Sequence, residues 1–209
     1  MLSEMNGKDA DIESIAWEAL TDETLLSELV DGLKSSKETF RYKCFKVLMT
    51  ISEKHGELLY PRWDYFVGLL DSDNSYRKMS AIQLIANLTR VDKENRFEKI
   101  LEKYYGLLDD NSMIVAIYVA SNSGKIVNAK PNLESQITNK LLGIDRTHHP
   151  EGRKPLIKAG AIEAFDQYFN GAVNKQGIIQ FVKEQQNGDS PKTRKLAKEF
   201  LRKREHHNA

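Results

Sequence analysis

Apolar residues recur along the chain at the spacing of an amphipathic helix. From residue 39 to 54 they are separated by four, three, one and three positions: Phe40, Cys44, Val47, Leu48 and Ile51. This spacing places them on one face of a helix with about 3.6 residues per turn. Strand signals such as an Asn-Gly or Asp-Gly turn between alternating apolar runs are missing from the sequence. The pattern therefore predicts an all-α protein.

Short polar turns divide the sequence into eleven expected helices. They lie near 11–20, 22–34, 38–54, 58–71, 75–90, 93–108, 111–128, 131–143, 153–169, 174–186 and 191–204. Asp71-Ser72-Asp73 precedes the helix expected at 75–90, and such side chains commonly cap a helix N-terminus. Gly56 stands where a glycine would end the helix expected at 38–54.

The turns recur at a period in the upper thirties. Gly32, Gly68 and Gly106 are 36 and then 38 residues apart, and Arg41 and Arg77 are also 36 apart. This period, with two helices per unit, is typical of helical repeats. It predicts one repeat domain over 22–205, with units near 22–57, 58–92, 93–130, 131–173 and 174–205. An acidic capping segment, 1–21, precedes the domain, and a short tail, 206–209, follows it.

Two stretches resemble the HEAT and armadillo families of α-solenoids. Residues 68–77, Gly-Leu-Leu-Asp-Ser-Asp-Asn-Ser-Tyr-Arg, are similar to the acidic turn and following arginine of a HEAT repeat. Residues 157–165, Ile-Lys-Ala-Gly-Ala-Ile-Glu-Ala-Phe, are similar to the Ala-Gly-Ala-Ile stretch of an armadillo third helix. The resemblance implies a right-handed superhelix of about five stacked helix pairs. It also implies that the second helix of each pair lies on the concave face, where partners dock.

The resemblance also suggests roles for the residues after each turn. In HEAT repeats the arginine at this position pairs with acids of the turn and of neighbouring units. Carried across, the ladder arginines are Arg41, Arg77, Arg153 and Arg194, and the expected acids are Asp71, Asp73, Asp109 and Asp110. With the neighbouring lysines, the candidate residues for a structural ladder or, second, for ligand binding are Arg41, Lys43, Arg77, Lys78, Arg153, Lys154, Arg194 and Lys195.

The function that this resemblance favours is a non-enzymatic scaffold that holds a protein or peptide on its concave face. The sequence contains no G-x-S-x-G, P-loop or G-x-G-x-x-G motif, and we expect no catalytic residues and no cofactor. Cys44, on the apolar stripe, is expected to be a buried core thiol. A structural subunit of a larger assembly is a further alternative.

A nucleic-acid-binding protein is the main competing interpretation. Some HEAT-like proteins resemble DNA alkyl-base glycosylases, and Trp63-Asp64-Tyr65 invites that comparison. The aromatic residues continue an apolar stripe, however, which favours core packing. A net charge of +1 also gives no general attraction for phosphates.

Charge is unevenly distributed between the two ends of the sequence. Residues 1–31 carry nine acidic residues and one lysine, whereas residues 192–204 carry seven basic residues and one glutamate. Terminal repeats need polar outer surfaces, so both clusters are expected as solubilising caps. Alternatively they bind different partners or each other, and the basic C-terminal helix could contact nucleic acid or an acidic protein.

The histidines offer one possible metal site. His148-His149, with Asp145 and Glu151, has suitable ligand types, but adjacent histidines in a loop have no fixed geometry, and we expect no metal. His206-His207 is expected to belong to the tail. The single cysteine fits a reducing compartment, and the longest apolar run, Met113 to Ala120, is too short to span a bilayer. We therefore expect a cytoplasmic protein without a membrane anchor.

Overall fold

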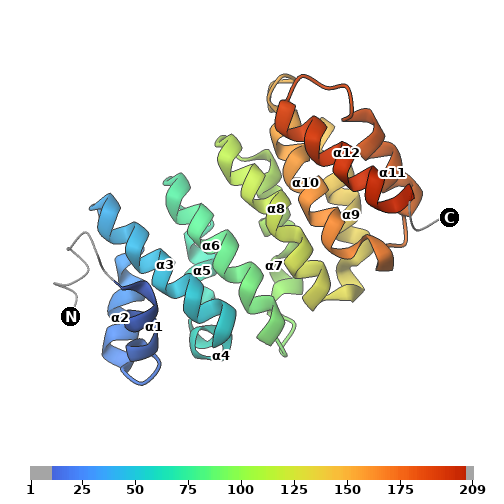
Figure 1. The fold of residues 1–209 in the computed structure, drawn as a ribbon. Coiled ribbons are helices and arrows are strands. Elements are labelled where there is room, and N and C mark those ends of the chain that lie inside the picture. The colour runs from blue at the N-terminus through green and yellow to red at the C-terminus, as the bar shows by residue number, and fades with distance from the viewer. Residues whose placement is uncertain (1–10, 206–209) are drawn as a thin grey trace. The chain divides into compact units, whose positions relative to one another are not determined.

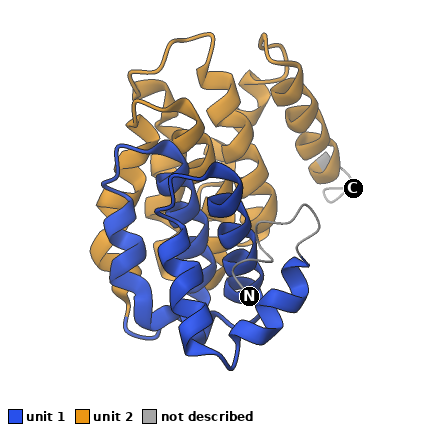
Figure 2. Cartoon of the chain, turned by 90° about the vertical axis from the view of Figure 1, so that its left-hand side faces the viewer, with its two compact units in different colours: residues 1–94 blue, residues 95–209 orange. Residues whose placement is uncertain are grey.

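The computed structural model describes residues 11–205, so the first ten residues and the tail from 206 lie outside the described part of the chain. Every regular element in that part is a helix (Figure 1). The chain divides into two compact units, unit 1 up to Glu94 and unit 2 from Asn95 (Figure 2). None of the described helices combines the length and apolar character needed to cross a membrane.

Unit 1 is built from helices that pack in succession along the chain. Its helices are α1 (Ile12–Ala19), α2 (Glu23–Gly32), α3 (Glu38–Lys54), α4 (Gly56–Leu59), α5 (Trp63–Leu69) and α6 (Ser75–Leu88). The long helix α3 packs against α1 and α2 on one side and against α6 on the other, and α5 packs against α6 (Figure 1).

Unit 2 repeats this arrangement. Its helices are α7 (Arg96–Gly106), α8 (Met113–Ala129), α9 (Glu134–Leu142), α10 (Lys154–Tyr168), α11 (Lys175–Glu184) and α12 (Pro191–Glu205). Helix α10 lies between α8 and α12, while α9 packs against α11 (Figure 1). Each unit is thus a stack of helix pairs, the all-α helical-repeat architecture that the sequence predicts. The division of the chain into five repeats and the right-handed sense of the superhelix stay predictions.

The expected helices are confirmed, with three local corrections. Pro61 lacks an N–H donor, and the stretch expected as one helix at 58–71 is α4, a 3-10 turn (Tyr60–Arg62) and α5. Gly56 does not cap α3, because α3 ends at Lys54 and Gly56 begins α4. The N-cap of α6 is Asn74 rather than Asp71-Ser72-Asp73; its side chain accepts hydrogen bonds from the main-chain N–H groups of Tyr76 and Arg77, at 3.0 and 3.2 Å.

The α3–α6 contact in unit 1 contains a buried hydrogen bond. The Asn87 amide of α6 donates to Ser52 Oγ of α3 at 2.8 Å, and the Ser52 hydroxyl donates to the carbonyl of Met49. Large apolar residues of the two helices are buried on either side, among them Leu48, Ile51 and Ile85. A satisfied polar pair inside an apolar contact fixes how the two helices align.

The α8–α10 contact in unit 2 consists of small residues. Ala116 and Ala120 of α8 and Ala159 and Ala161 of α10 are fully buried. Gly160 lies so close to α8 that an added Cβ would be 3.0 Å from the Ile117 carbonyl oxygen. The Ala-Gly-Ala stretch therefore works as a close helix–helix contact, because no larger residue fits between the two backbones.

Candidate functional site

An open hollow in unit 2 lies where α10 and α12 end. Its volume is about 760 Å³, and it opens between the end of α10, the 3-10 turn Phe169–Gly171 (η7), α11 and the last turn of α12. We call it the C-terminal groove; the side chains that give it its charge and shape are those of Asp166, Phe169, Lys175, Lys183, Lys203 and Arg204. Open hollows of this size that combine apolar and polar groups are typical of binding sites.

An ion-pair network joins the two helix ends at the wall of the groove. Asp166 on α10 contacts Lys203 Nζ at 2.5 Å and Arg204 Nη1 at 2.7 Å, both on α12. Burial alone would raise the pKa of Asp166, but the hydrogen bonds from Lys203 and Arg204 outweigh it and lower the pKa below its usual value. The carboxylate is therefore ionised at neutral pH and holds two cations in place.

Arg204 is fixed by aromatic rings as well as by Asp166. Its guanidinium carbon is 3.5 Å from the centroid of the Phe200 ring and 4.8 Å from that of Phe169. The two rings themselves meet edge to face at 5.4 Å. Cations attract the faces of aromatic rings, and this contact adds to the ion pair. The end of α12 is thereby a preformed wall rather than a loose tail.

Helix α11 contributes a row of side chains to the opposite wall. Lys175, Ile179 and Lys183 all line the groove and are four residues apart, so they share one face of the helix. Lys175 Nζ lies 5.9 Å from the Phe169 ring centroid, and Ile179 is half-buried. Lys183 has no ion pair or hydrogen bond with the rest of residues 11–205, and its ammonium group faces solvent. The row presents an apolar side chain between two cations.

A smaller hollow of about 360 Å³ adjoins the groove across η7. Glu134, at the start of α9, lines this hollow. Its carboxylate accepts hydrogen bonds from Thr138 Oγ1 at 2.8 Å and from the Val173 main-chain N–H at 3.2 Å. The Thr138 hydroxyl also bonds to the Tyr168 hydroxyl, and burial raises the pKa of Tyr168. Asp166, Phe169 and Asn170 line both hollows.

The predicted ladder arginines donate to main-chain carbonyls in the turns. Arg41 Nη1 is 2.8 Å from the Ser35 carbonyl oxygen, and Arg194 Nη1 is 2.7 Å from that of Gly188, in each case six residues earlier. Arg77 Nη2 reaches the Lys34 carbonyl at 2.7 Å, in the turn of the preceding helix pair. These arginines therefore bind main-chain carbonyls of the turns, whereas their pairing with turn acids and their role as a ladder or in ligand binding stay predictions.

In the fourth pair Lys154 takes the role expected for Arg153. Lys154 is buried, and its Nζ donates to the Asp145 carbonyl at 2.7 Å and to Glu151 at 2.6 Å, whereas Arg153 is exposed. The longer loop before α10 explains the shift in register, because the chain needs more residues to return to the helix.

The three remaining predicted candidates are all lysines. Lys43 and Lys78 are half-buried, and Lys195 is exposed. Within residues 11–205, the residues that line the C-terminal groove include none of the eight predicted candidates. The groove therefore has a different set of cations from the one expected.

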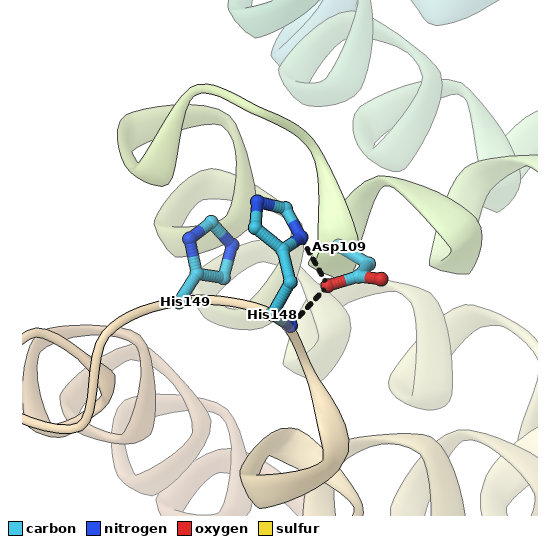
Figure 3. Close-up of side chains that lie close together, drawn as sticks. All are labelled: Asp109, His148 and His149. Atoms are coloured by element: carbon cyan, nitrogen blue, oxygen red, sulfur yellow. Dashed lines mark hydrogen bonds and ion pairs between the residues drawn. The ribbon is translucent and has the colours of Figure 1, made fainter.

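The paired histidines join the loop before α10 to the turn after α7 (Figure 3). Asp109 Oδ1 accepts the main-chain N–H of His148 at 2.7 Å and also bonds to His148 Nδ1 at 2.7 Å. The hydrogen bond from the His148 main chain is the main reason why the pKa of Asp109 is lowered. Asp145 and Glu151, the acids of the disfavoured metal-site alternative, pair instead with Lys158 and Lys154.

The same geometry is unsuited to a shared metal ion. His149 is buried with its Nε2 3.1 Å from the Leu108 carbonyl, and the two imidazoles are stacked with centroids 4.6 Å apart and planes 28° apart. Metal ligation uses the lone pair in the plane of the ring, and the in-plane lone pairs of stacked rings do not converge on one ion. The bonds of His148 and His149 to Asp109 and Leu108 act as a clamp: they hold the loop before α10 against the turn after α7.

The two sequence features that suggested chemistry lie in the core of unit 1. Trp63 is buried, and the half-buried Tyr65 donates its hydroxyl to the Val30 carbonyl at 3.0 Å. Cys44 is buried as expected, and burial raises its pKa to about 12. A thiol with that pKa is not a nucleophile at neutral pH, and Trp63 has no exposed ring for a base.

The groove was missed because its parts are separated along the sequence. Asp166 and Lys203 are 37 residues apart and meet only because α10 and α12 pack side by side. The excess of basic residues over 192–204 was the one available signal.

Comparison with known proteins gives a structural likeness only. No protein-family model matches the chain, and no curated protein matches it. Among solved structures, a designed armadillo repeat protein is similar with 16% sequence identity and a TM-score of 0.48, over 96% of this chain and 97% of that one.

Proposed function

We propose that this protein is a non-enzymatic scaffold that binds a protein or peptide partner, and that the C-terminal groove is its contact site. The observation that supports the proposal is the groove itself: an open hollow whose walls are the ends of packed helices. It contains cations, apolar side chains and amides, which suit an extended polypeptide better than a small molecule buried on all sides.

The rigidity of the walls supports the same interpretation. The end of α12 is fixed by Asp166 and by the aromatic contacts of Arg204. A preformed surface loses little conformational entropy when a partner binds, so modest contacts suffice for measurable affinity. This is the physical advantage of a stacked-helix scaffold.

Nucleic acid is the second candidate, and the basic face of α12 is what favours it. Three of its cations already have acidic partners, however: Lys192 pairs with Glu163 at 2.9 Å, and Lys203 and Arg204 share Asp166. Binding to a phosphate backbone depends on several cations free to displace counterions. The buried position of Trp63 also argues against the glycosylase alternative.

The proposal is tested by selection from a displayed library of random dodecapeptides, followed by amide NMR mapping of the enriched peptides on the full chain. We expect the shifted amides to lie in η7, α11 and the last turns of α12. Lys183→Glu should weaken binding, whereas Lys46→Glu, an exposed charge reversal in unit 1, should not. Failure to enrich any peptide, or shifts confined to other helices, would overturn the proposal.

A further inference from the structure

We propose that the C-terminal groove selects an acidic segment with an apolar residue between two acids, and that Asp166 competes with the incoming carboxylates; this inference rests on the proposed function. Three features of the groove carry it: the balance of its charges, the spacing of its free cations and the position of Asp166.

The charge of the groove is positive after its internal pairs are counted. Four basic residues line it against the single carboxylate of Asp166. That carboxylate is shared by Lys203 and Arg204, and Lys203 still has a largely exposed side chain. Lys175 and Lys183 make no ion pair with other residues in the described part of the chain. An anionic partner would therefore gain charge interactions that the protein does not make by itself.

The spacing on α11 fixes the spacing in the partner. Lys175 and Lys183 are eight residues apart, which corresponds to about 12 Å along a helix axis. An extended peptide covers that distance in about four residues. Two acids at positions i and i+4 would reach the two lysines, and the residue midway between them would face the half-buried Ile179.

Asp166 indicates what Lys203 and Arg204 recognise. The two cations contact a carboxylate at 2.5 and 2.7 Å, a geometry typical of charge-assisted hydrogen bonds. A partner carboxylate that approaches Lys203 meets the negative charge of Asp166 and has to share or displace it. Asp166 thus weakens the binding of a peptide that carries one acidic residue. It favours peptides that also contact Lys175, Lys183 and Ile179.

A peptide fits this groove better than a single strand of nucleic acid. Single strands bind by stacking bases on exposed aromatic rings along a basic track. The Arg204 guanidinium lies 4.8 Å from the centroid of the Phe169 ring, so a cation already contacts this ring. Between the two lysines lies an aliphatic side chain, which offers no platform for a base.

The probe is a fluorescein-labelled dodecapeptide with Glu-Ser-Leu-Ser-Glu at its centre, and its counterpart has both acids replaced by Gln. Fluorescence anisotropy with the full chain should detect the acidic peptide, with at least tenfold weaker binding of the Gln peptide. Lys175→Glu and Lys183→Glu should each weaken binding about tenfold, and Lys46→Glu should leave it unchanged. Asp166→Asn should strengthen it about threefold or more.

The outcomes separate this inference from the proposed function. If library peptides bind the groove but carry no acids, or if the Gln peptide binds equally well, the inference is overturned and the scaffold proposal stands. If no peptide of any sequence binds the groove, the scaffold proposal itself fails. If oligothymidylate of twelve residues binds more tightly and displaces the peptide, the groove is a nucleic-acid site. If Asp166→Asn keeps the thermal melt of the wild type but weakens binding, the competing role of Asp166 is wrong.

Discussion

Successive second helices meet in two different ways in the two units. In unit 1, α3 and α6 share large apolar residues and a buried hydrogen bond between Ser52 and Asn87. In unit 2, α8 and α10 approach until an added Cβ at Gly160 would touch the backbone of Ile117. One contact is aligned by a polar pair and the other by the absence of a side chain. The comparison shows that one repeat architecture tolerates different chemistry at the same kind of contact.

Gly160→Leu should give the largest effect, a loss of about 3 kcal/mol in the free energy of unfolding. The new side chain would overlap main-chain atoms of α8, and α10 would have to move away. Urea unfolding followed by circular dichroism measures the change.

The matched control for Gly160→Leu is Gly68→Ala, at an exposed helical glycine with open space around it. This variant should raise the free energy of unfolding by about 0.5–1 kcal/mol, because alanine has a higher helix propensity than glycine. If Gly160→Leu lowers the free energy of unfolding by less than about 1 kcal/mol, the α8–α10 contact does not depend on the missing side chain, and the contrast with the α3–α6 contact is wrong.

Gly32→Ala should destabilise unit 1 by about 2 kcal/mol, and Cys44→Ala should rescue most of that loss. The added Cβ would lie 2.3 Å from Cys44 Sγ, so the overlap is with a side-chain atom that can be removed. A double-mutant cycle by urea unfolding measures the coupling. Additive losses would show that the two residues do not oppose each other as described.

Ser52→Ala should cost about 1 kcal/mol in the free energy of unfolding. It removes the acceptor of the Asn87 amide inside the α3–α6 contact. Thermal and urea unfolding measure the change, and Ser121→Ala on α8, a half-buried serine that bonds only within its own helix, is the control. Equal losses of unfolding free energy for Ser52→Ala and Ser121→Ala would show that the Ser52–Asn87 bond does not contribute specifically to the α3–α6 contact.

The smallest expected effect is a pH dependence in unit 2. The folded pKa of Asp109 is lowered from the ordinary value of 3.8, so its contribution to stability is complete above that value and is lost as the pH falls through the lower folded pKa. Asp109→Asn should therefore flatten the acid side of the curve of unfolding free energy against pH, which urea unfolding at a series of pH values measures. An unchanged acid side would contradict the clamp between Asp109 and His148.

The helices were predictable because burial on one face imposes a period that a sequence displays directly. The stripe of Cys44, Val47, Leu48 and Ile51 is buried as its spacing implies. The Ala-Gly-Ala stretch at Ala159–Ala161 resembles an armadillo third helix in sequence, but its role as a close contact with α8 depends on the distance between two backbones. Such a distance is a tertiary quantity and leaves no periodic signal.

The site residues were harder to predict for a related reason. The sequence marks arginines that follow turns, and these bind carbonyls of their own scaffold. The shift from Arg153 to Lys154 depends on the path of the loop before α10. The groove itself arises from side chains at the ends of α10 and α12, which carry no common motif.

The acceptors of Arg41 and Arg194 set no requirement on the side chains of the turns. A main-chain oxygen is present whatever residue occupies the turn, so the bonds to Ser35 and Gly188 survive substitution at those positions. The side chains of turns fastened in this way can be exchanged without loss of the bond. The arginine is then the one side chain that each of these two hydrogen bonds requires.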